Sequence, residues 1–209
     1  MFKKMNPVPK KFNDDDIDID IDIGGDSQTN LVSVNNNKIM FHAAVNSETC
    51  HKLLKCLSQA MKYVALTNAL SEFDVPMKVY LHICSNGGDV YSALAVVDTI
   101  ISSKIDVVTV CEGFVASAGV FIALSGKERF IRKHAYMLIH ELRSGCYGKY
   151  SECQDDMKNN DILMNDMKAF MNERCQNKLL KKKLSKVLKH DLLWDSNKCL
   201  KFGLVEKIV

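Results

Sequence analysis

KVYLHICSNGGDVYSALAVVDTIISSKIDVVTVCEGFVASAGVFIALS, residues 78–125, is the stretch of sequence that decides the fold. Its pattern predicts strands over Lys78–Cys84 and Asp106–Cys111. Apolar residues at helical spacing predict helices over Val90–Ser102 and Ala118–Ser125. Strands and helices that alternate with short connections form right-handed βαβ units, in which the strands run parallel. The stretch therefore predicts an α/β fold with a parallel core sheet.

The same alternation continues on both sides of this stretch. Upstream, a short strand is expected over Lys38–Ala43 and a helix over Ser47–Leu66, with Ser47 as its cap. Downstream, strands are expected over Arg129–Ile131 and Ala135–Ile139. A chain of 209 residues that is 47% hydrophobic has enough apolar material for one packed domain.

The first 30 residues differ from the rest in composition. From Asp14 to Asp26 the sequence reads DDDIDIDIDIGGD, in which Ile and Asp alternate with the period of a strand. Asp is a poor strand former and like charges on one face repel, so residues 1–30 are expected to be an acidic arm outside a domain of residues 31–209. Two interpretations of the arm stay open: a solvating tail, or a segment that orders against another subunit.

Charge and composition exclude several classes of protein. The arm through Asp26 carries four Lys and seven Asp, a net charge of −3; because the whole chain has +3, the remainder carries +6. A total this close to neutral does not favour nucleic-acid binding. No stretch reaches the roughly 18 apolar residues of a membrane span, and the N-terminus lacks the apolar core of a signal peptide. We therefore expect a cytoplasmic protein that binds neither nucleic acid nor membrane.

The eight cysteines and six histidines indicate neither a disulfide scaffold nor a metal site. No cysteines form a CxxC pair, and the histidines show no ligand spacing with them. Four cysteines lie inside apolar or helical runs: Cys50, Cys84, Cys111 and Cys199. We expect buried, reduced thiols, with no metal and no other cofactor.

A segment without Pro or Gly runs from Ser151 to about Lys189. As one unbroken helix it would extend well over ~50 Å, which exceeds the diameter of a domain of this size. Five of its apolar residues form a stripe: Met157, Met164, Met167, Phe170 and Met171. We expect the helix to protrude and to pack against a neighbouring subunit. The alternative is a helical hairpin that folds back on the same chain.

Open parallel sheets place their sites at the carboxyl ends of the strands, and three expected strands end in residues suited to chemistry. Gly87-Gly88 follows the first, where the backbone can approach a ligand closely. Ser117 follows the second, between Ala116 and Ala118-Gly119, and is a candidate nucleophile at the positive end of a helix. Its alternative role is to cap that helix. His140 follows the last strand, as a general base or a surface residue.

Two carboxylates lie close together near the C-terminal end of the chain. Asp191 enters an otherwise apolar run, where a buried carboxylate would need a partner. Asp195 precedes a short helix expected over Ser196–Phe202 and ended by Gly203, so it is expected to be an N-cap.

The order of these blocks resembles the ClpP family, the proteolytic subunits of Clp proteases. The matching blocks are the Gly87-Gly88 loop, the Ala-Ser-Ala-Gly turn at Ser117, the Met-Leu-Ile-His strand end at His140, the long helix, Asp191 and a closing Phe-Gly-Leu-Val-Glu. The resemblance covers about residues 38–209. It implies an α/β spiral of βαβ units, of the type shared with crotonases.

The resemblance also implies an assembly and an activity. A protruding handle, here about residues 144–189, would join two stacked heptameric rings around a chamber. The chain would be a serine endopeptidase that hydrolyses peptide bonds in unfolded polypeptides delivered by an AAA+ unfoldase, without a cofactor. In bacterial members the N-terminal segment gates the pore, whereas the matching region here is the acidic arm.

The resemblance implies a role for each candidate residue. Ser117 matches the nucleophile, His140 the general base and Asp191 the third member of the triad, since its spacing to Gly203 fits the family better than that of Asp195. Gly88 and Ala118 match the backbone N–H donors of the oxyanion hole. Gly87, Glu141 and Leu142 match the residues that bind the substrate strand.

The chain departs from the family pattern at three places. Asn86 stands where the family has Pro, Glu141-Leu142 replaces Gln-Pro, and His190 precedes Asp191 where Arg is common. In the family, this neighbourhood couples the assembly of the rings to the alignment of the triad, so the resemblance leaves the number of subunits per ring and this coupling open. Alternatives are a viral or phage head-maturation protease that cleaves a dedicated scaffold protein, a non-catalytic ring subunit, and a crotonase-type acyl-CoA enzyme.

Overall fold

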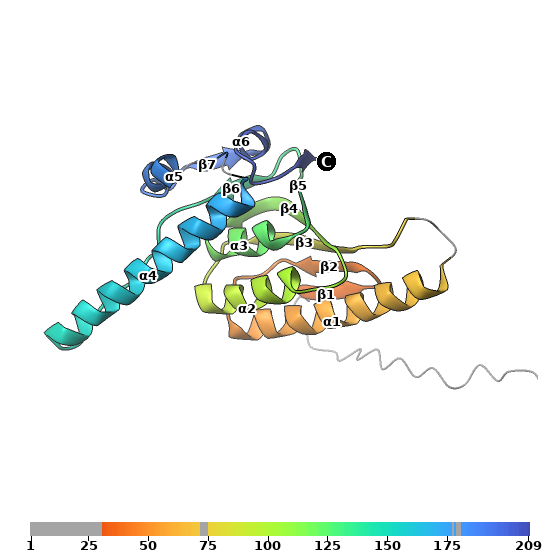
Figure 1. Cartoon of the computed structure of the whole chain (residues 1–209), viewed down its shortest axis with the longest axis horizontal. Coiled ribbons are helices and arrows are strands. Elements are labelled where there is room, and N and C mark those ends of the chain that lie inside the picture. Colours follow the sequence, from red (N-terminus) through yellow and green to blue (C-terminus); the bar gives the residue numbers. More distant parts are fainter. Residues whose placement is uncertain (1–30, 72–74, 177, 179–180) are drawn as a thin grey trace, which may run out of the picture.

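The computed structural model describes residues 31–71, 75–176, 178 and 181–209. The acidic arm expected over residues 1–30 lies outside the described residues. The described chain forms a sheet covered by helices, from which one long helix protrudes (Figure 1). The α/β class is therefore confirmed.

An eight-stranded sheet forms the centre of the described chain. Its strands are β1 (Val32–Asn35), β2 (Lys38–Phe41), β3 (Val79–Ser85), β4 (Val107–Ala116), β5 (Glu128–Ile131), β6 (Tyr136–Leu138), β7 (Leu193–Asp195) and β8 (Lys207–Ile208). The main path runs β1-β2-β3-β4-β5-β8, and all its pairs after the antiparallel β1–β2 hairpin are parallel. The expected parallel core sheet is confirmed.

Strand β4 is longer than the expected Asp106–Cys111 and pairs with three strands, β3, β5 and β6. Its first half pairs with β5, and its last three residues, beginning at Phe114, pair with β6. Gly113 lies between the two halves with φ of 55°, a conformation that favours glycine. The change of partner leads β4 to the same edge as β6, which in turn pairs antiparallel with β7.

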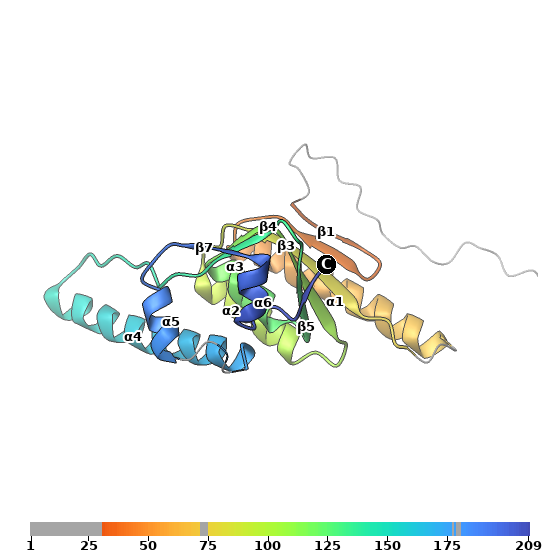
Figure 2. The same ribbon diagram turned by 90° about the horizontal axis from the view of Figure 1, so that it is seen from above.

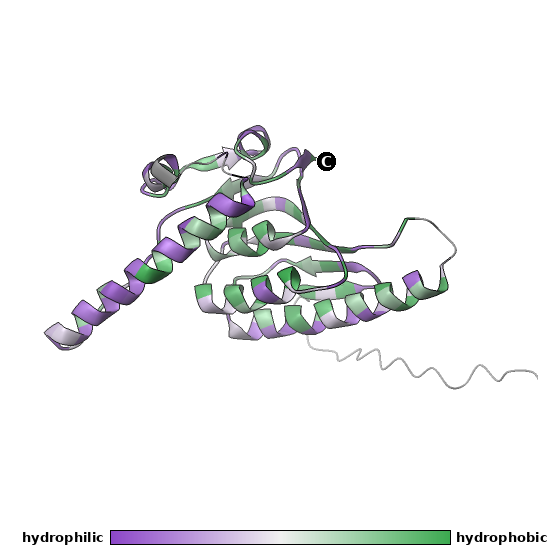
Figure 3. Cartoon of the chain, in the orientation of Figure 1, coloured by the Kyte–Doolittle hydropathy of each residue, from purple (hydrophilic) through white to green (hydrophobic). Residues whose placement is uncertain are grey.

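Helices α1 (Ser47–Leu70) and α3 (Ala118–Ser125) pack against the sheet, and α2 (Val90–Ile101) packs against both of them. Their positions agree with the sequence prediction, and every residue of α3 is buried. The cap expected at Ser47 is wrong, because Asn46 precedes the helix and forms a reciprocal capping box with Thr49. Figure 3 shows that α2 and α3 are largely apolar, whereas the outer part of helix α4 (Tyr150–Arg174) is largely hydrophilic.

The unbroken helix expected over Ser151–Lys189 is wrong. Helix α4 (Tyr150–Arg174) ends early, and a separate short helix, α5 (Lys181–Val187), packs against it (Figures 1 and 2). Just beyond α4, Gln176 has a φ of 52°, where the helical path of the backbone ends. The Arg174 guanidinium donates to the carbonyl oxygens of Leu124, at 2.7 Å, and Gly126. These bonds cap the end of α3 and hold the end of α4 against the domain.

The apolar stripe of α4 divides along its length. Met167 and Met171, near the domain, are buried, and Phe170 packs beside Phe121 with ring centroids 6.0 Å apart. Towards the outer end, Met157 is 68% exposed and Ile162 is 61% exposed. The protruding part of α4 is therefore unpaired with this chain's own core (Figure 3).

The cysteine prediction is correct in part. Cys50, Cys111 and Cys199 are free and buried, and Cys84 is free and half-buried. Cys146 and Cys153, however, form a disulfide between the segment after His140 and the first turn of α4. Their separation of 7 residues brings the thiols together once α4 begins at Tyr150. In the part of the chain that the structure describes, no helix is long and apolar enough to cross a membrane.

Candidate active site

Ser117 lies in a strained turn between β4 and α3. Its φ is 54° and its ψ is −127°, a backbone conformation that a non-glycine residue adopts only when its surroundings enforce it. The Ser117 N–H donates to the carbonyl oxygen of Leu138 in β6 at 3.0 Å, which holds the turn. The side chain makes no capping hydrogen bond to α3. Ser117 thus occupies the N-cap position of α3, as the alternative interpretation expected, but its hydroxyl group does not cap the helix.

Gly87 approaches this turn, and Gly88 approaches Val45, more closely than a residue with a Cβ atom could. A Cβ atom on Gly87 would lie 2.5 Å from the Ser117 Cβ, and one on Gly88 would lie 2.1 Å from the Val45 carbonyl oxygen. Val45 in turn donates its N–H to the Gly87 carbonyl at 2.9 Å and accepts from Asp89 at 2.8 Å. This ladder fixes the glycine loop beside Ser117.

His140 reaches the same edge because β6 pairs parallel with the end of β4. Its Nδ1 lies 2.5 Å from the carbonyl oxygen of Glu141. A carbonyl oxygen can only accept, so Nδ1 carries the proton of this hydrogen bond, and Nε2 of the neutral ring is left as a base. This is the tautomer that a general base towards a serine hydroxyl requires.

Asp191 follows α5 and precedes β7, which pairs antiparallel with β6. In this pairing Leu138 lies opposite Leu193, so extending the register by two residues would place His140 opposite Asp191. The side chain of Asp191 is nevertheless bonded to the Arg143 guanidinium and is half exposed. The ladder itself ends at Leu138–Leu193, and beyond it the Glu141 N–H donates to Leu188, two residues out of that register. The side chains of His140 and Asp191 have other partners.

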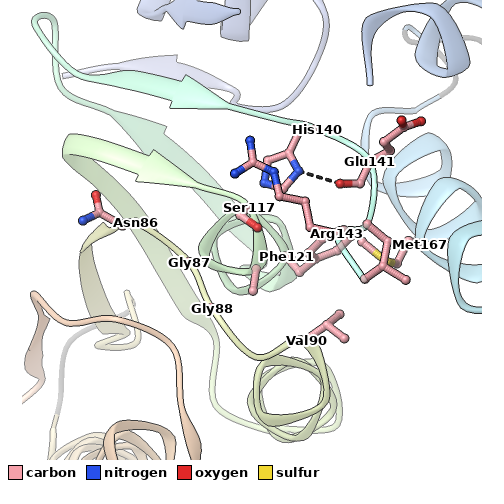
Figure 4. Close-up of a pocket in the computed structure, with 12 residues that line it drawn as sticks. Asn86, Gly87, Gly88, Val90, Ser117, Phe121, His140, Glu141, Arg143 and Met167 are labelled. Atoms are coloured by element: carbon pink, nitrogen blue, oxygen red, sulfur yellow. Dashed lines mark hydrogen bonds between the residues drawn. The ribbon is translucent and has the colours of Figure 1, made fainter. Parts of the chain in front are cut away.

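A cleft of about 300 Å³ joins most of the predicted residues (Figure 4). Its lining residues are Asn86, Gly87, Gly88, Val90, Ser117, Ala118, Phe121, His140, Glu141, Leu142, Arg143 and Met167. Seven of the eight residues predicted from the sequence are in this set, and Asp191 is outside it. The apolar floor formed by Val90, Phe121 and Met167, and the cationic Arg143, were missed, because none belongs to a motif that stands out in the sequence.

Two backbone N–H groups of the segment after His140 already have partners within the chain. The Glu141 N–H donates to the Leu188 carbonyl at 2.8 Å, and the Leu142 N–H points at the Met164 sulfur at 3.1 Å. A thioether is a weak acceptor. The Leu142 N–H can therefore exchange the Met164 sulfur for a substrate carbonyl oxygen at a small cost in free energy.

A second group of ionisable side chains lies across β2–β4, outside the cleft. Buried His82 is 2.7 Å from Glu112, which also contacts His42 and Arg132. Burial lowers the pKa of His82, although the hydrogen bond to Glu112 opposes this. Burial works against the charged Glu112 carboxylate, yet the bonds from His82 and Arg132 outweigh it and lower its pKa. Among the described residues, no group of three or more His, Cys, Asp or Glu is placed to hold a metal ion.

Comparison with known proteins defines the class first by the fold. A solved ClpP1 mutant from Listeria monocytogenes matches with a TM-score of 0.64, 22% identity, and coverage of 80% of this chain and 87% of that one. The fold is therefore the ClpP-like spiral of βαβ units with a protruding handle helix.

The sequence comparisons then give the family. The family model described as Clp protease matches residues 34–209. A proteolytic subunit of an ATP-dependent Clp protease from Borrelia garinii is 31% identical over 144 residues, 67% of this chain and 72% of that protein. A proteolytic subunit 2 from a Synechococcus strain is 28% identical over 158 residues, 72% of this chain and 76% of that protein. The chain belongs to the Clp protease family.

Proposed function

We propose that this chain is a serine endopeptidase that hydrolyses peptide bonds in unfolded polypeptides. One observation carries the proposal: Ser117, after β4, and His140, after β6, line one cleft, while Asp191 lies just before β7, the strand that pairs with β6. A nucleophile, a base and a carboxylate from three adjacent strands form the constellation that acyl transfer requires. Membership of the Clp protease family supports the same activity.

The proposed reaction proceeds through an acyl-enzyme. The Ser117 Oγ attacks the substrate carbonyl carbon while His140 Nε2 takes the hydroxyl proton, and the backbone N–H groups of Gly88 and Ala118 stabilise the oxyanion. Ala118 is the first residue of α3, so its N–H has no partner within the helix. His140 then gives the proton to the leaving amine, and a water molecule, activated by His140, releases the acyl group.

Asp191 completes this mechanism only after a change of partners. In the structure the Glu141 carbonyl takes the Nδ1 proton of His140, and Arg143 holds Asp191. Rotation of the Asp191 side chain away from Arg143 would let it accept from Nδ1. A charged acceptor would stabilise the imidazolium ion more strongly than the neutral carbonyl does.

The substrate would bind as an extended strand along the cleft. Gly87 lies on one side, and Glu141 and Leu142 on the other. Main-chain hydrogen bonds from these segments would bind polypeptides with little demand on their sequence. The apolar floor of Val90, Phe121 and Met167 would accept one substrate side chain.

We propose that the active form is a ring assembly, as stacked heptamers, joined through α4. The exposed apolar side chains Met157 and Ile162 support this, because a protruding helix needs a partner to cover them. An AAA+ unfoldase that supplies the chamber with unfolded chains fits the relatives, whose names describe ATP-dependent proteases.

Cleavage of a fluorogenic peptide by the assembled protein tests the proposal. Ser117→Ala is expected to abolish cleavage, and Asp191→Asn to slow it by roughly 10⁴-fold, as loss of the third triad member does elsewhere. Asp195→Asn is the matched control: its carboxylate caps α6 (Ser196–Lys201) by accepting from Lys198 N at 2.7 Å, so the cleavage rate should stay within about twofold. Equal cleavage by wild type and Ser117→Ala would refute the proposal, and inversion of the two Asp results would refute the choice of Asp191.

A further inference from the structure

Arg143 is a cation in the candidate active site with no role in the triad mechanism. Among the described residues that line the cleft, it is the one side chain with a permanent positive charge. It follows His140 by three residues, and Figure 4 shows its side chain extending back towards the His140 ring. The side chain is 73% exposed, so it is accessible to a bound polypeptide.

Arg143 already binds a carboxylate, that of Asp191. A guanidinium group presents planar donors that match a carboxylate, which is why Arg binds this group in many sites. Both partners are largely exposed, and exposed ion pairs are weak. A second carboxylate in the cleft can therefore replace Asp191 at small cost.

The Arg143–Asp191 pair competes with the proposed triad. While Asp191 is bonded to Arg143, the Nδ1 proton of His140 goes to the Glu141 carbonyl instead. The Glu141 carboxylate does not relieve this competition, because Figure 4 shows it turned away from Ser117 and from the Arg143 guanidinium. A carboxylate that binds Arg143 in place of Asp191 would shift this competition towards the triad.

We propose that Arg143 is the carboxylate-binding residue of the cleft: it recognises a carboxylate of the bound polypeptide and, in doing so, releases Asp191 to His140. The polypeptide would thereby promote its own cleavage. The inference rests on the proposed function, since it assigns a substrate preference and a form of control to the same site.

Peptide binding to the Ser117→Ala protein tests recognition without any need for activity. The probes are fluorescent Ala-rich octapeptides with an amidated C-terminus, in pairs that differ by Glu or Gln at one position. A Gln peptide with a free C-terminus tests whether the terminal carboxylate serves instead. We expect the Glu peptide to bind about twofold to fivefold more tightly at one position, the range that an exposed ion pair provides.

The preference for Glu should disappear when Arg143→Ala is added and persist in part in Arg143→Lys. The matched control is Arg132→Ala, which removes another half-exposed Arg bonded to a carboxylate, Glu112, outside the cleft. This variant should keep the full preference. A preference that survives Arg143→Ala, or that is absent in the Ser117→Ala protein, would overturn the inference.

The rate of labelling by a small uncharged fluorophosphonate tests the release of Asp191. Arg143→Ala should label about twofold to fivefold faster than wild type, the range that an exposed ion pair gives. Slower or unchanged labelling would show that Arg143 does not restrain Asp191, and this part of the inference would fail. Absence of labelling in every variant would instead refute the proposed function, while the binding result would still decide whether Arg143 recognises a carboxylate.

Discussion

The two sides of the cleft are built in opposite ways. The nucleophile side, with Gly87, Gly88 and Ser117, consists of backbone fixed between buried strands and α3. The base side, residues 140–149 with Asp191, is largely exposed and its polar groups bond within the chain. The fold itself therefore fixes Gly87, Gly88 and Ser117, whereas a hydrogen bond between His140 and Asp191 would require both side chains to change partners.

Glycine substitutions on the two sides should give the largest contrast. Gly87→Ala places a Cβ 2.5 Å from the Ser117 Cβ at a φ of +82°, so the loop or the Ser117 turn must move. We expect a loss of at least about 3 kcal/mol in the free energy of unfolding, measured in urea. Gly145→Ala, where a Cβ would have nothing within 4 Å, should change it by less than about 0.5 kcal/mol. Similar losses in the two variants would show that the sides do not differ in rigidity.

Asp191, just before β7, and Asp195, the last residue of β7, should give a smaller contrast. Asp195→Ala removes the cap of α6 and should cost about 0.5–2 kcal/mol in the free energy of unfolding. Asp191→Ala removes only an exposed pair with Arg143 and should cost about 1 kcal/mol at most. A larger stability loss for Asp191→Ala would mean that Asp191 is a structural residue rather than a catalytic one.

The smallest expected effect is the pH dependence of the free energy of unfolding that the buried His82 causes. Burial lowers the pKa of His82 in the folded chain, so as the pH falls the unfolded chain takes up the proton first. The contribution of neutral His82 to the free energy of unfolding is therefore fully present above the pKa of the unfolded chain, about 6.5, and is lost as the pH falls below it. The loss should not exceed about 1.4 kcal/mol per pH unit. Urea unfolding between pH 7.5 and 5.5 measures this slope, above the range in which the lowered pKa of Glu112 acts.

Two variants control for this slope. It should be absent in His82→Gln and unchanged in His134→Gln, since His134 is exposed. An equal slope in wild type and His82→Gln would place the titrating group elsewhere.

The sequence allowed the parallel core and the nucleophile side to be predicted because both depend on local patterns. Strands that end in Gly87-Gly88 and in small residues around Ser117 indicate a strand-end site, and the structure places them beside each other. Helix propensity alone, however, could not predict that α4 ends at Arg174, since no Pro or Gly marks the end and the Arg174 side chain binds a carbonyl oxygen of α3 50 residues away in sequence.

The base side was harder to predict for the same reason. Strand β7 is three residues long and lies inside an apolar run, so its pairing with β6 has no visible signature in the sequence. The Arg143–Asp191 pair spans 48 positions. The Cys146–Cys153 disulfide depends on where α4 begins. Each of these features arises from tertiary contacts rather than from residue spacing.

Mapping of the fluorophosphonate adduct tests the central claim most directly. The assembled wild-type protein is labelled to completion, digested, and its peptides are analysed by mass spectrometry. We predict one adduct per chain, on the Oγ of Ser117, and none in the Ser117→Ala protein. An adduct on another residue, or an unlabelled Ser117 in the assembled protein, would contradict the assignment of Ser117 as the nucleophile.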